Sequence, residues 1–524
     1  MTAPELRSFV RTVFDVLHDD QRTTITDSLV ARATYGHAGW KPSRPSTRVV
    51  DEVCAFADAA RRVAYADPDE VSDYLRQGTR AFLAGDHASA RAVFEALLLP
   101  IAHGDINLGQ HEMVEEVLNI DLHVTVAQYV TSVYTTTRLG GRANAVYSAM
   151  THLEGVASLG NPIADMEGVS AGALPDLGPF LPRWVKRLER VRPAKDDWDA
   201  LPERWLHEAV FRMDGVEGLE RIAQKTKRPQ ACLAWCEALS ERGDWPAALR
   251  AYADAAKLVG KSPWRGELLD GAALAAQQLG RSDVAARLEA AWVAAPSMAR
   301  LLRWLVAPGS QSLTLVIKAG RALKRCPKTD GRQLGLLRIV TGDLGGAVKL
   351  LADAPGLGWS SADHPGHVLF PAFAILLAEG GSHRIGPTLL ANLESACRDP
   401  LEILDRSGMV TKPTLAIPSL GALLDDFQST VVIDTPDRDA MFDAMRIAAE
   451  KRIEGILGQS RRRHYGHAAT LVASRLAAAP KHLQAAASDW IAHLLVANSR
   501  RHAFKDELHA ALKSVGLAVP FDLL

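Results

Sequence analysis

The spacing of a phosphate-binding loop occurs at residues 255–262, which read AAKLVGKS. In such a loop a strand leads into a glycine-rich turn, whose amides and lysine hold phosphates before a helix begins. Here residues 246–258 have the pattern of a helix, Pro263 follows the loop at once, and no strand bearing a magnesium-binding acid is evident. We therefore predict a loop that ends a helix, and we keep a nucleotide-binding role for Lys261 as the alternative.

A nucleophile-elbow pattern, Gly-x-Ser-x-Gly, occurs at residues 168–172. In hydrolases this pattern places the serine on a sharp turn between a strand and a helix. Pro162 and Pro175 flank the pattern here, within a stretch rich in glycine and proline. We therefore predict a flexible linker, with a hydrolase acting through Ser170 as the alternative.

Histidine pairs occur twice with the same spacing, at His364/His367 and at His464/His467. Metal-binding helices usually place two histidines four residues apart and take a third ligand from elsewhere. The first pair lies in a turn with proline and glycine, and the second follows three arginines on a predicted helix. We predict structural or surface roles for both pairs and no metal site.

Residues 105–116 resemble a calcium loop only in part. Such a loop needs a turn-forming glycine at its sixth position, and this chain has Gln110 there. We instead expect Asp105 or Asn107 to cap the acidic helix that follows.

Basic residues recur at helical spacing and could contact an acidic partner. The stripes comprise Lys318, Arg321, Lys324, Arg325 and Lys328; Arg183, Lys186, Arg187 and Arg190; Arg461 to Arg463; and Arg500, Arg501 and Lys505. Such stripes can bind phosphates, although most basic helix faces are solvated or paired with acidic neighbours. We select Trp245, Arg250, Lys318, Arg321 and Arg325 as candidate partner-binding residues, and we predict no catalytic, cofactor-binding or metal-binding residue.

The composition is typical of a soluble helical protein. Hydrophobic residues make up 48% of the 524 residues, and they are mostly Ala, Leu and Val, of which Ala and Leu favour helices. With 60 basic and 61 acidic residues, net charge creates no general attraction to nucleic acid or membrane. The most apolar stretch, 368–378, is too short to cross a bilayer, and no apolar run follows residues 1–5 as a signal peptide would require.

The five cysteines form no disulfide framework. Cys232 and Cys236 lie four residues apart, but two further ligands at suitable spacing are missing, so we predict small packing residues. Reduced thiols are typical of a cytoplasmic protein.

Helical periodicity recurs along almost the whole chain, as in residues 49–60. Thr2 and Glu5 have the spacing of a capping box ahead of an apolar stripe that runs from Leu6 to Leu17. The best strand candidate is the short run 430–433, and no run of strands joined by hairpin turns is evident.

Small residues recur at the offsets of a helical hairpin. Such a hairpin needs a small residue where its helices cross, a Gly that ends the first helix, and then an Ala and a large apolar residue in the second. These positions are filled by Gly78, Gly85, Ala90 and Phe94; by Cys236, Gly243, Ala248 and Tyr252; by Gly335, Gly342, Ala347 and Leu351; and more loosely by Gly280, Ala285 and Leu288. The pattern resembles the tetratricopeptide repeat (TPR), in degenerate form because its spacing is irregular. The resemblance implies stacked hairpins that bind a protein or peptide.

Phrases in the C-terminal half carry a second resemblance. They lie at 271–280 (GAALAAQQLG), 364–367 (HPGH), 465–469 (YGHAA) and 500–508 (RRHAFKDEL). Together they are similar to the helical region of bacterial SWIM zinc-finger proteins and their uncharacterised relatives. The zinc motif of that family, Cys-x-Cys followed by Cys-x-His, is absent from this chain. The resemblance therefore implies a helical scaffold, and neither zinc nor an activity.

We therefore predict an all-α protein, an irregular α-solenoid of TPR-like hairpins. Its predicted parts are an N-terminal helical unit with one TPR-like hairpin (1–158), a Gly/Pro-rich connection (159–182), TPR-like repeats (183–398), an irregular segment (399–438) and a C-terminal helical bundle (439–524). The predicted function is a non-catalytic scaffold for a protein or peptide, without a cofactor, in the cytoplasm. The alternatives are a nucleic-acid-associated repeat protein that uses the basic stripes, and the hydrolase or nucleotide-binding protein described above.

Overall fold

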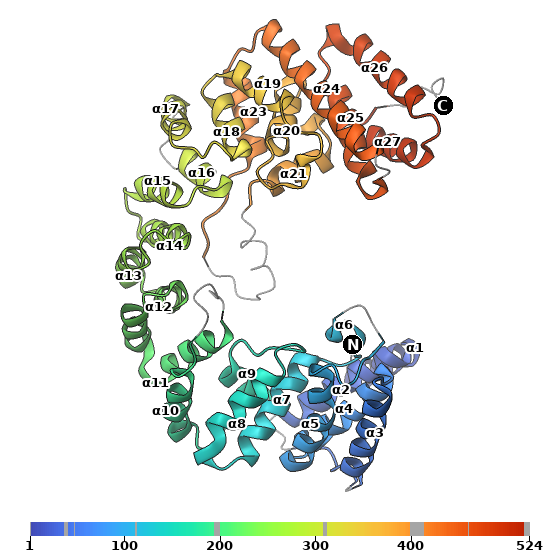
Figure 1. Ribbon diagram of the computed structural model, residues 1–524, viewed down its shortest axis with the longest axis vertical. Helices are drawn as coiled ribbons and strands as arrows, with labels where there is room; N and C mark the ends of the chain where they lie inside the picture. Colours follow the sequence, from blue (N-terminus) through green and yellow to red (C-terminus); the bar gives the residue numbers. More distant parts are fainter. Residues whose placement is uncertain are drawn as a thin grey trace. The chain divides into compact units, whose positions relative to one another are not determined.

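The computed structural model describes residues 2–35, 40–46, 48–109, 113–192, 200–307, 312–398, 413–458 and 461–517 (Figure 1). Within these ranges the chain forms 26 α-helices and no β-strand, so the predicted all-α class is confirmed. Among the described residues, the β-type backbone pairing is limited to one isolated bridge between Tyr65 and Asn107. The chain divides into two compact units, Met1–Trp235 and Cys236–Leu524, and the division falls inside helix α12 (Pro229–Glu241).

Unit 1 contains α1 to α11. Their bounds are α1 (Ala3–Val16), α2 (Asp19–Tyr35), α3 (Val49–Val63), α4 (Pro68–Leu83), α5 (His87–Ala102), α6 (Val114–Val117), α7 (Leu122–Thr136), α8 (Leu139–His152), α9 (Pro162–Gly168), α10 (Leu177–Leu188) and α11 (Leu201–Thr226). From α3 onward, most helices pack against their neighbours along the chain. The core of unit 1 runs between them as a row of buried rings, in which Phe180, Trp184 and Trp205 stack in turn.

Helices α4 and α5 form the first predicted hairpin. Gly85, which follows α4 and precedes α5, has a φ of +81°, a conformation that glycine adopts without steric cost. A Cβ on Gly78 would lie 2.7 Å from the ring of Phe94, so the two helices cross closely at that glycine. Ala90 and Phe94 are fully buried at this crossing. The small and large residues therefore have the packing roles that their offsets predicted.

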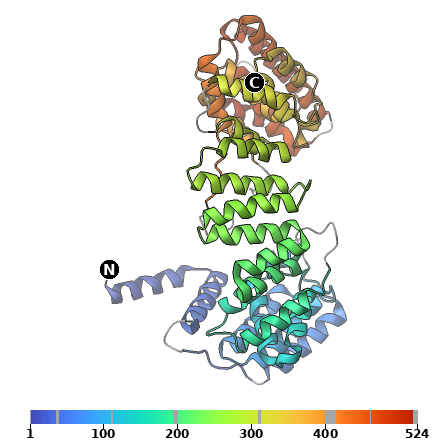
Figure 2. The same ribbon diagram turned by 90° about the vertical axis from the view of Figure 1, so that its left-hand side faces the viewer.

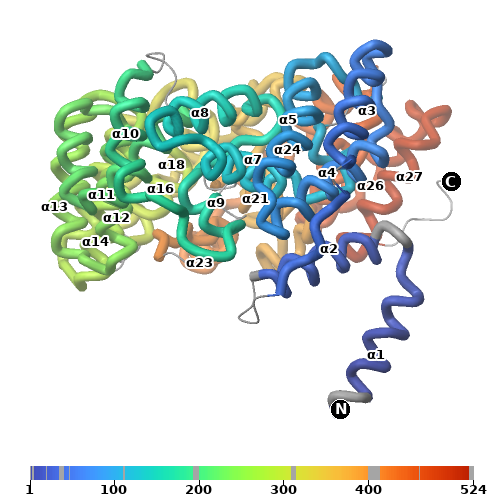
Figure 3. The backbone as a smooth tube through the Cα atoms, turned by 90° about the horizontal axis from the view of Figure 1, so that it is seen from below, coloured from blue at the N-terminus to red at the C-terminus, as the bar shows by residue number. Residues whose placement is uncertain are grey.

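The N-terminal helix α1 leads away from the other helices of unit 1 (Figures 2 and 3). Thr2 and Glu5 form the predicted capping box. The predicted apolar stripe is largely exposed, with Leu6 at 50% and Phe9 at 58% of their full accessibility. Sequence periodicity thus identifies the helix correctly but does not say what its apolar face contacts.

Unit 2 contains the remaining helices. Among them, the elements from α18 to α25 surround the pocket described in the next section. The bounds are α13 (Trp245–Leu258), α14 (Arg265–Gln278), α15 (Val284–Ala294), α16 (Met298–Leu305), α17 (Ser312–Leu323), α18 (Gly331–Val340), α19 (Leu344–Ala352), η1 (Gly358–Ser360), α20 (Gly366–Leu377), η2 (Gly381–Arg384), α21 (Pro387–Ser395), α23 (Leu420–Thr430), α24 (Thr435–Leu457), η4 (Arg462–His464), α25 (Tyr465–Ala477), η5 (Lys481–Leu483), α26 (Gln484–Ala497) and α27 (His502–Ser514).

Helix α20 is the centre of unit 2. Every residue from Val368 to Leu377 is buried, and α18, α21, α23, α24 and α25 all pack against the helix. It coincides with the most apolar stretch of the sequence, which a buried position explains. No described helix combines the length and the apolar character that a membrane crossing requires.

Three glycines after α12, α14 and α18 end these helices in the left-handed region, as the repeat pattern predicts: Gly243, Gly280 and Gly342. The pairs of helices that cross closely in unit 2 differ in part from the predicted hairpin pairs. A Cβ on Gly335 would lie 2.7 Å from Leu369 of α20, so α18 crosses α20 there and not its hairpin partner α19. The TPR relationship and the solenoid arrangement therefore stay predictions.

Gly271 on α14 gives a direct test of this packing. A Cβ there would lie 2.2 Å from the ring of Tyr252, which is buried on α13. We expect Gly271→Ala to lower the free energy of unfolding by about 1–3 kcal/mol, because the buried ring cannot move away without strain. The measurement is the urea midpoint. Gly320→Ala on α17 is the control: its Cβ meets open space, so this change should be neutral or stabilising by up to about 1 kcal/mol. Equal effects of the two changes would contradict the close crossing.

Several local predictions were wrong. Residues 159–182, expected as an irregular connection, contain α9 and the first turns of α10, and Ile163, Met166 and Phe180 are fully buried there. Pro162 opens α9 at its first turn, where a missing N–H costs nothing, so it does not mark a linker here. The predicted irregular segment 399–438 includes α23 and the start of α24, while its residues 399–412 lie outside the described ranges. The strand candidate 430–433 forms no strand: Thr430 ends α23, and the rest lies in the connection to α24.

The calcium-like segment also differs from the expectation. The short helix α6 begins at Val114 after Met113, without a side-chain cap from Asp105 or Asn107. The Asn107 side chain instead accepts a hydrogen bond from the Gly109 amide. Gln110 lies outside the described residues.

Candidate anion-binding pocket

The five candidate residues from the sequence lie on two helices of unit 2 and just beyond them. Trp245 begins α13 and is half-buried, and Arg250 is exposed on the same helix. Lys318 and Arg321 lie on α17, and Arg325 follows its end. The Lys318 ammonium donates to the Trp304 carbonyl (2.9 Å) and Arg325 pairs with Glu289 (3.6 Å). None of the five lines the pocket described below.

The two motifs that resemble catalytic loops have no strand beside them. Residues 246–258 belong to α13, and Gly260 ends that helix in the left-handed region before Lys261. The predicted helix-ending loop is confirmed. Ser170 follows α9, and its hydroxyl donates to the Met166 carbonyl (2.6 Å) in the manner of a helix end. Neither Lys261 nor Ser170 has the strand–turn–helix setting that its motif requires.

Three of the four paired histidines, from segments about a hundred residues apart in the sequence, meet around one tryptophan. The ring centroid of Trp359 lies 4.7 Å from His364, 5.5 Å from His367 and 4.9 Å from His467. Trp359 comes from η1, the first pair from the start of α20 and the second from the start of α25. Packing of α20 against both α24 and α25 brings these segments together.

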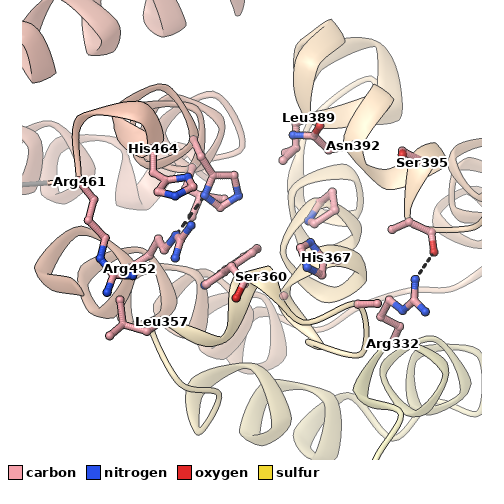
Figure 4. A pocket seen from close by; sticks show the side chains of 17 residues that line it. Arg332, Leu357, Ser360, His367, Leu389, Asn392, Ser395, Arg452, Arg461 and His464 are labelled. Atoms are coloured by element: carbon pink, nitrogen blue, oxygen red, sulfur yellow. Dashed lines mark hydrogen bonds between the residues drawn. The ribbon is translucent and has the colours of Figure 1, made fainter. Parts of the chain in front are cut away.

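Beside this cluster lies a pocket of about 450 Å³, which we call the basic pocket (Figure 4). Its lining residues include three arginines and three histidines: Arg332, Arg452, Arg461, His367, His464 and His467. No aspartate or glutamate is among its described lining residues. Arg452, Arg461 and His464 approach it from one side, and Arg332 and Ser395 from the other (Figure 4). The pocket therefore concentrates positive charge in a chain whose net charge is close to zero.

Arg452 is the most unusual of these side chains. It is only 7% exposed, and burial together with the neighbouring Arg461 lowers its pKa. Its Nε donates to Nδ1 of His467 (3.3 Å) and its Nη1 to the Gly356 carbonyl (3.4 Å). No carboxylate among the described residues forms an ion pair with it. A buried guanidinium without a counter-ion is costly, and an anion beside it would offset that cost.

The hydrogen bonds around the histidines fix which ring nitrogens carry protons. Arginine can only donate, so Nδ1 of His467, which receives Arg452, is unprotonated and its Nε2 carries the proton. In the same way Arg463 donates to Nε2 of His464 (3.2 Å), which leaves the proton of His464 on Nδ1. His464 and His467 therefore each have a ring N–H group that remains available as a donor.

His364 has a structural role, which confirms that part of the prediction. Its Nδ1 accepts from the Gly366 amide (3.1 Å) at the start of α20, and its Nε2 donates to the Pro355 carbonyl (3.0 Å). The helix start is packed tightly here, since a Cβ on Gly366 would lie 2.4 Å from the Trp359 ring. His367 donates from Nε2 to the Ser361 carbonyl (3.1 Å). These bonds hold the residues 355–367 that form one wall of the pocket.

That wall is also tied to α24. The Lys451 ammonium donates to the Ala352 carbonyl (2.6 Å). The next residue on α24, Arg452, donates to the Gly356 carbonyl, so two consecutive side chains hold this wall. The opposite wall is held by Arg332, whose Nη1 donates to the Ala396 carbonyl (2.8 Å) after α21 and whose Nη2 lies 3.8 Å from Asp363. Arg332 thus has structural partners, whereas Arg452 lacks a carboxylate partner.

The histidines should make the protein sensitive to acid. Burial and the neighbouring Arg452 lower the pKa of His467 to about 3, and burial lowers that of His364 to about 4. The groups facing His467 are Arg452, His367, His464 and His364, which all disfavour its protonation. In the unfolded chain a histidine takes up a proton near pH 6.5. Stability is therefore fully present above pH 6.5 and falls as the pH decreases toward the folded pKa values.

We expect protonation of His467 in the unfolded chain to lower the free energy of unfolding by about 2 kcal/mol between pH 6.5 and pH 5, because His467 of the folded state stays unprotonated there. The measurement is the urea midpoint at both pH values for the wild type and for His467→Asn, whose Oδ1 takes the place of Nδ1 and can still accept from Arg452. The loss on acidification should be smaller in the variant. An identical loss in both proteins would show that His467 titrates normally.

The histidine pairs do not form a metal site with their neighbours. Across the described ranges, no group of three or more His, Cys, Asp or Glu side chains could hold a metal ion. The donors that the basic pocket offers are N–H groups of guanidinium and imidazole, which bind anions and not cations. No protein-family model matches the chain, and no curated protein is found to be similar to it.

Sequence reasoning found the histidine pairs but treated each alone, and it missed Trp359 and Arg452. The one available signal was that both pairs read His-x-Gly-His, at 364–367 and 464–467. This recurrence could indicate a shared local structure at two helix starts, but it gives no information on whether the two starts meet.

Proposed function

We propose that the protein is a non-catalytic binding scaffold of TPR-like helical hairpins that holds a protein or peptide partner through an acidic group in the basic pocket. The observation that carries the proposal is Arg452, buried and without a carboxylate partner in a cavity lined by arginine and histidine. An acidic group on the partner would supply the missing negative charge.

Two further features support a binding role. The pocket has the size of many ligand sites and combines polar donors with an apolar wall that includes Leu389 and Leu471. Helices α18, α20, α21, α24 and α25 supply the walls around it. We also propose a cytoplasmic location, which the free thiols of all five cysteines support.

The test is binding of a fluorescein-labelled hexaglutamate peptide, followed by fluorescence anisotropy at low salt and again at physiological salt. We expect binding that weakens as salt rises, and none for a hexaglutamine peptide of the same length. Arg452→Met should weaken binding about tenfold or more, because it removes a charge-assisted donor. Arg80→Met, on the exposed face of α4, is the matched control and should bind as the wild type does.

The outcomes separate the candidate functions. If hexaglutamate does not bind at low salt, the acidic-partner proposal fails. If a labelled oligothymidylate binds and competes with hexaglutamate, the nucleic-acid alternative is favoured in its place. Equal loss of binding in both arginine variants would place the contact outside the basic pocket.

A further inference from the structure

The donors on one side of the basic pocket come from separate elements and converge on a common space. Arg452 extends from α24, and His464 directly precedes α25 (Figure 4). His467 lies in the first turn of α25. Nε and Nη1 of Arg452 are used by protein acceptors, and no described residue accepts from its Nη2. The N–H groups of His464 and His467 are the other donors there, and the exposed Arg461 adds positive charge beside them.

We propose that this side of the basic pocket binds a phosphomonoester group. A carboxylate has one negative charge and two oxygens in a plane, whereas a phosphoryl group has a charge of about −1.5 to −2 and three acceptor oxygens in a tetrahedral array. Donors that arrive from a buried arginine and two separate imidazoles suit the tetrahedral group better than a planar one. Guanidinium is also the side chain best matched to phosphate geometry.

The backbone adds positive potential at the same place. The first turns of α20 and α25 supply Gly366 and His367, and His464 and His467, to the lining of the pocket. The N-terminus of a helix carries about half a positive charge and favours anions near it. The C-terminal end of α21, which lies at the opposite wall, is neutralised by the bond from Arg332 to Ala396.

The size of the pocket indicates an ester and not free phosphate. A volume of about 450 Å³ exceeds what a phosphate ion fills, and Leu357, Pro371, Leu389 and Leu471 supply apolar surface for an organic body. This inference rests on the proposed function, for which it identifies the acidic group as a phosphorylated side chain. A free sugar phosphate carries the same chemistry, so the experiment includes one.

The test compares three heptapeptides of one sequence that differ only at the central residue, which is phosphoserine, glutamate or serine. Titration calorimetry at pH 7.5 and constant ionic strength gives the affinities, and glucose 6-phosphate is a fourth ligand. We expect the phosphoserine peptide to bind about tenfold or more tightly than the glutamate peptide. Arg452→Met and His467→Leu should each reduce that preference, whereas Arg80→Met should keep it. Having two independent pocket variants keeps the test decisive if one of them does not fold.

Each outcome bears on a different statement. Equal affinity for the phosphoserine and glutamate peptides would overturn the phosphomonoester inference and leave the proposed function standing. If neither the phosphoserine peptide nor the glutamate peptide binds, the phosphomonoester inference and the proposed function both fail. Tight binding of glucose 6-phosphate without binding of the phosphopeptide would support the phosphomonoester and contradict the peptide partner. A preference for phosphoserine that survives in both pocket variants would place the phosphate elsewhere and overturn the inference.

Discussion

Arg452→Met should leave the protein slightly more stable than the wild type, by about 1 kcal/mol, while Arg475→Met should destabilise it by about 2 kcal/mol. Both arginines are buried in unit 2, at 7% and 4% exposure, and neither forms an ion pair with a described carboxylate. The comparison therefore distinguishes a buried arginine that serves binding, Arg452, from a buried arginine that stabilises the core, Arg475.

The difference lies in what surrounds each guanidinium. Arg475 lies over the ring of Phe442 at 3.8 Å and over that of Trp490 at 4.7 Å, and its Nε donates to the Phe442 carbonyl (3.2 Å). The two rings compensate its charge at all times, so methionine loses their attraction. No described aromatic ring lies under the Arg452 guanidinium, which borders the empty volume of the basic pocket instead. A hydrophobic side chain there removes the cost of an uncompensated charge.

The measurement is the urea midpoint of each variant of the full chain at pH 7.5. We expect the two variants to differ by about 3 kcal/mol, with the wild type between them. If Arg452→Met destabilises the protein as much as Arg475→Met does, the hydrogen bonds to His467 and Gly356 make Arg452 structural. The electrostatic argument for an anion site would then lose its main support.

The sequence indicates the helices and hairpin turns of this protein well because both depend on local chemistry. Glycines at 85, 243, 280 and 342 end helices in a conformation that other residues adopt only with strain, and this signal is visible in one dimension. Prolines were misleading at 159–182, because proline is also favoured in the first turn of a helix, as at the start of α9.

The basic pocket could not be predicted in the same way because it depends on contacts between distant segments. Arg452 follows Lys451 on a long helix and has no local feature that distinguishes it from a solvated residue. Its importance arises only when α24 packs beside residues 355–360 and the start of α25. The stripe of Lys318 and Arg325 shows the opposite case, since its spacing looked functional and its side chains have structural partners.

The largest loss of stability is expected for Trp292→Ala, at about 4 kcal/mol. Trp292 on α15 is fully buried, and its ring stacks on Trp304 of α16 with centroids 5.3 Å apart. Its indole N–H donates to the side-chain oxygen of Gln333 on α18 (2.6 Å). Alanine would leave a cavity between three helices and a buried amide without its donor, and both effects destabilise the folded state.

Two milder changes separate these effects. Trp292→Phe keeps an apolar ring but removes the N–H, so it should cost about 1–3 kcal/mol through the unpaired Gln333. Adding Gln333→Leu to Trp292→Phe should recover part of that loss, because the buried acceptor disappears with its donor. The urea midpoints of the two single variants and the double variant give the coupling directly. Additive losses would mean that the hydrogen bond contributes nothing, and that ring packing alone holds α15 and α16 against α18.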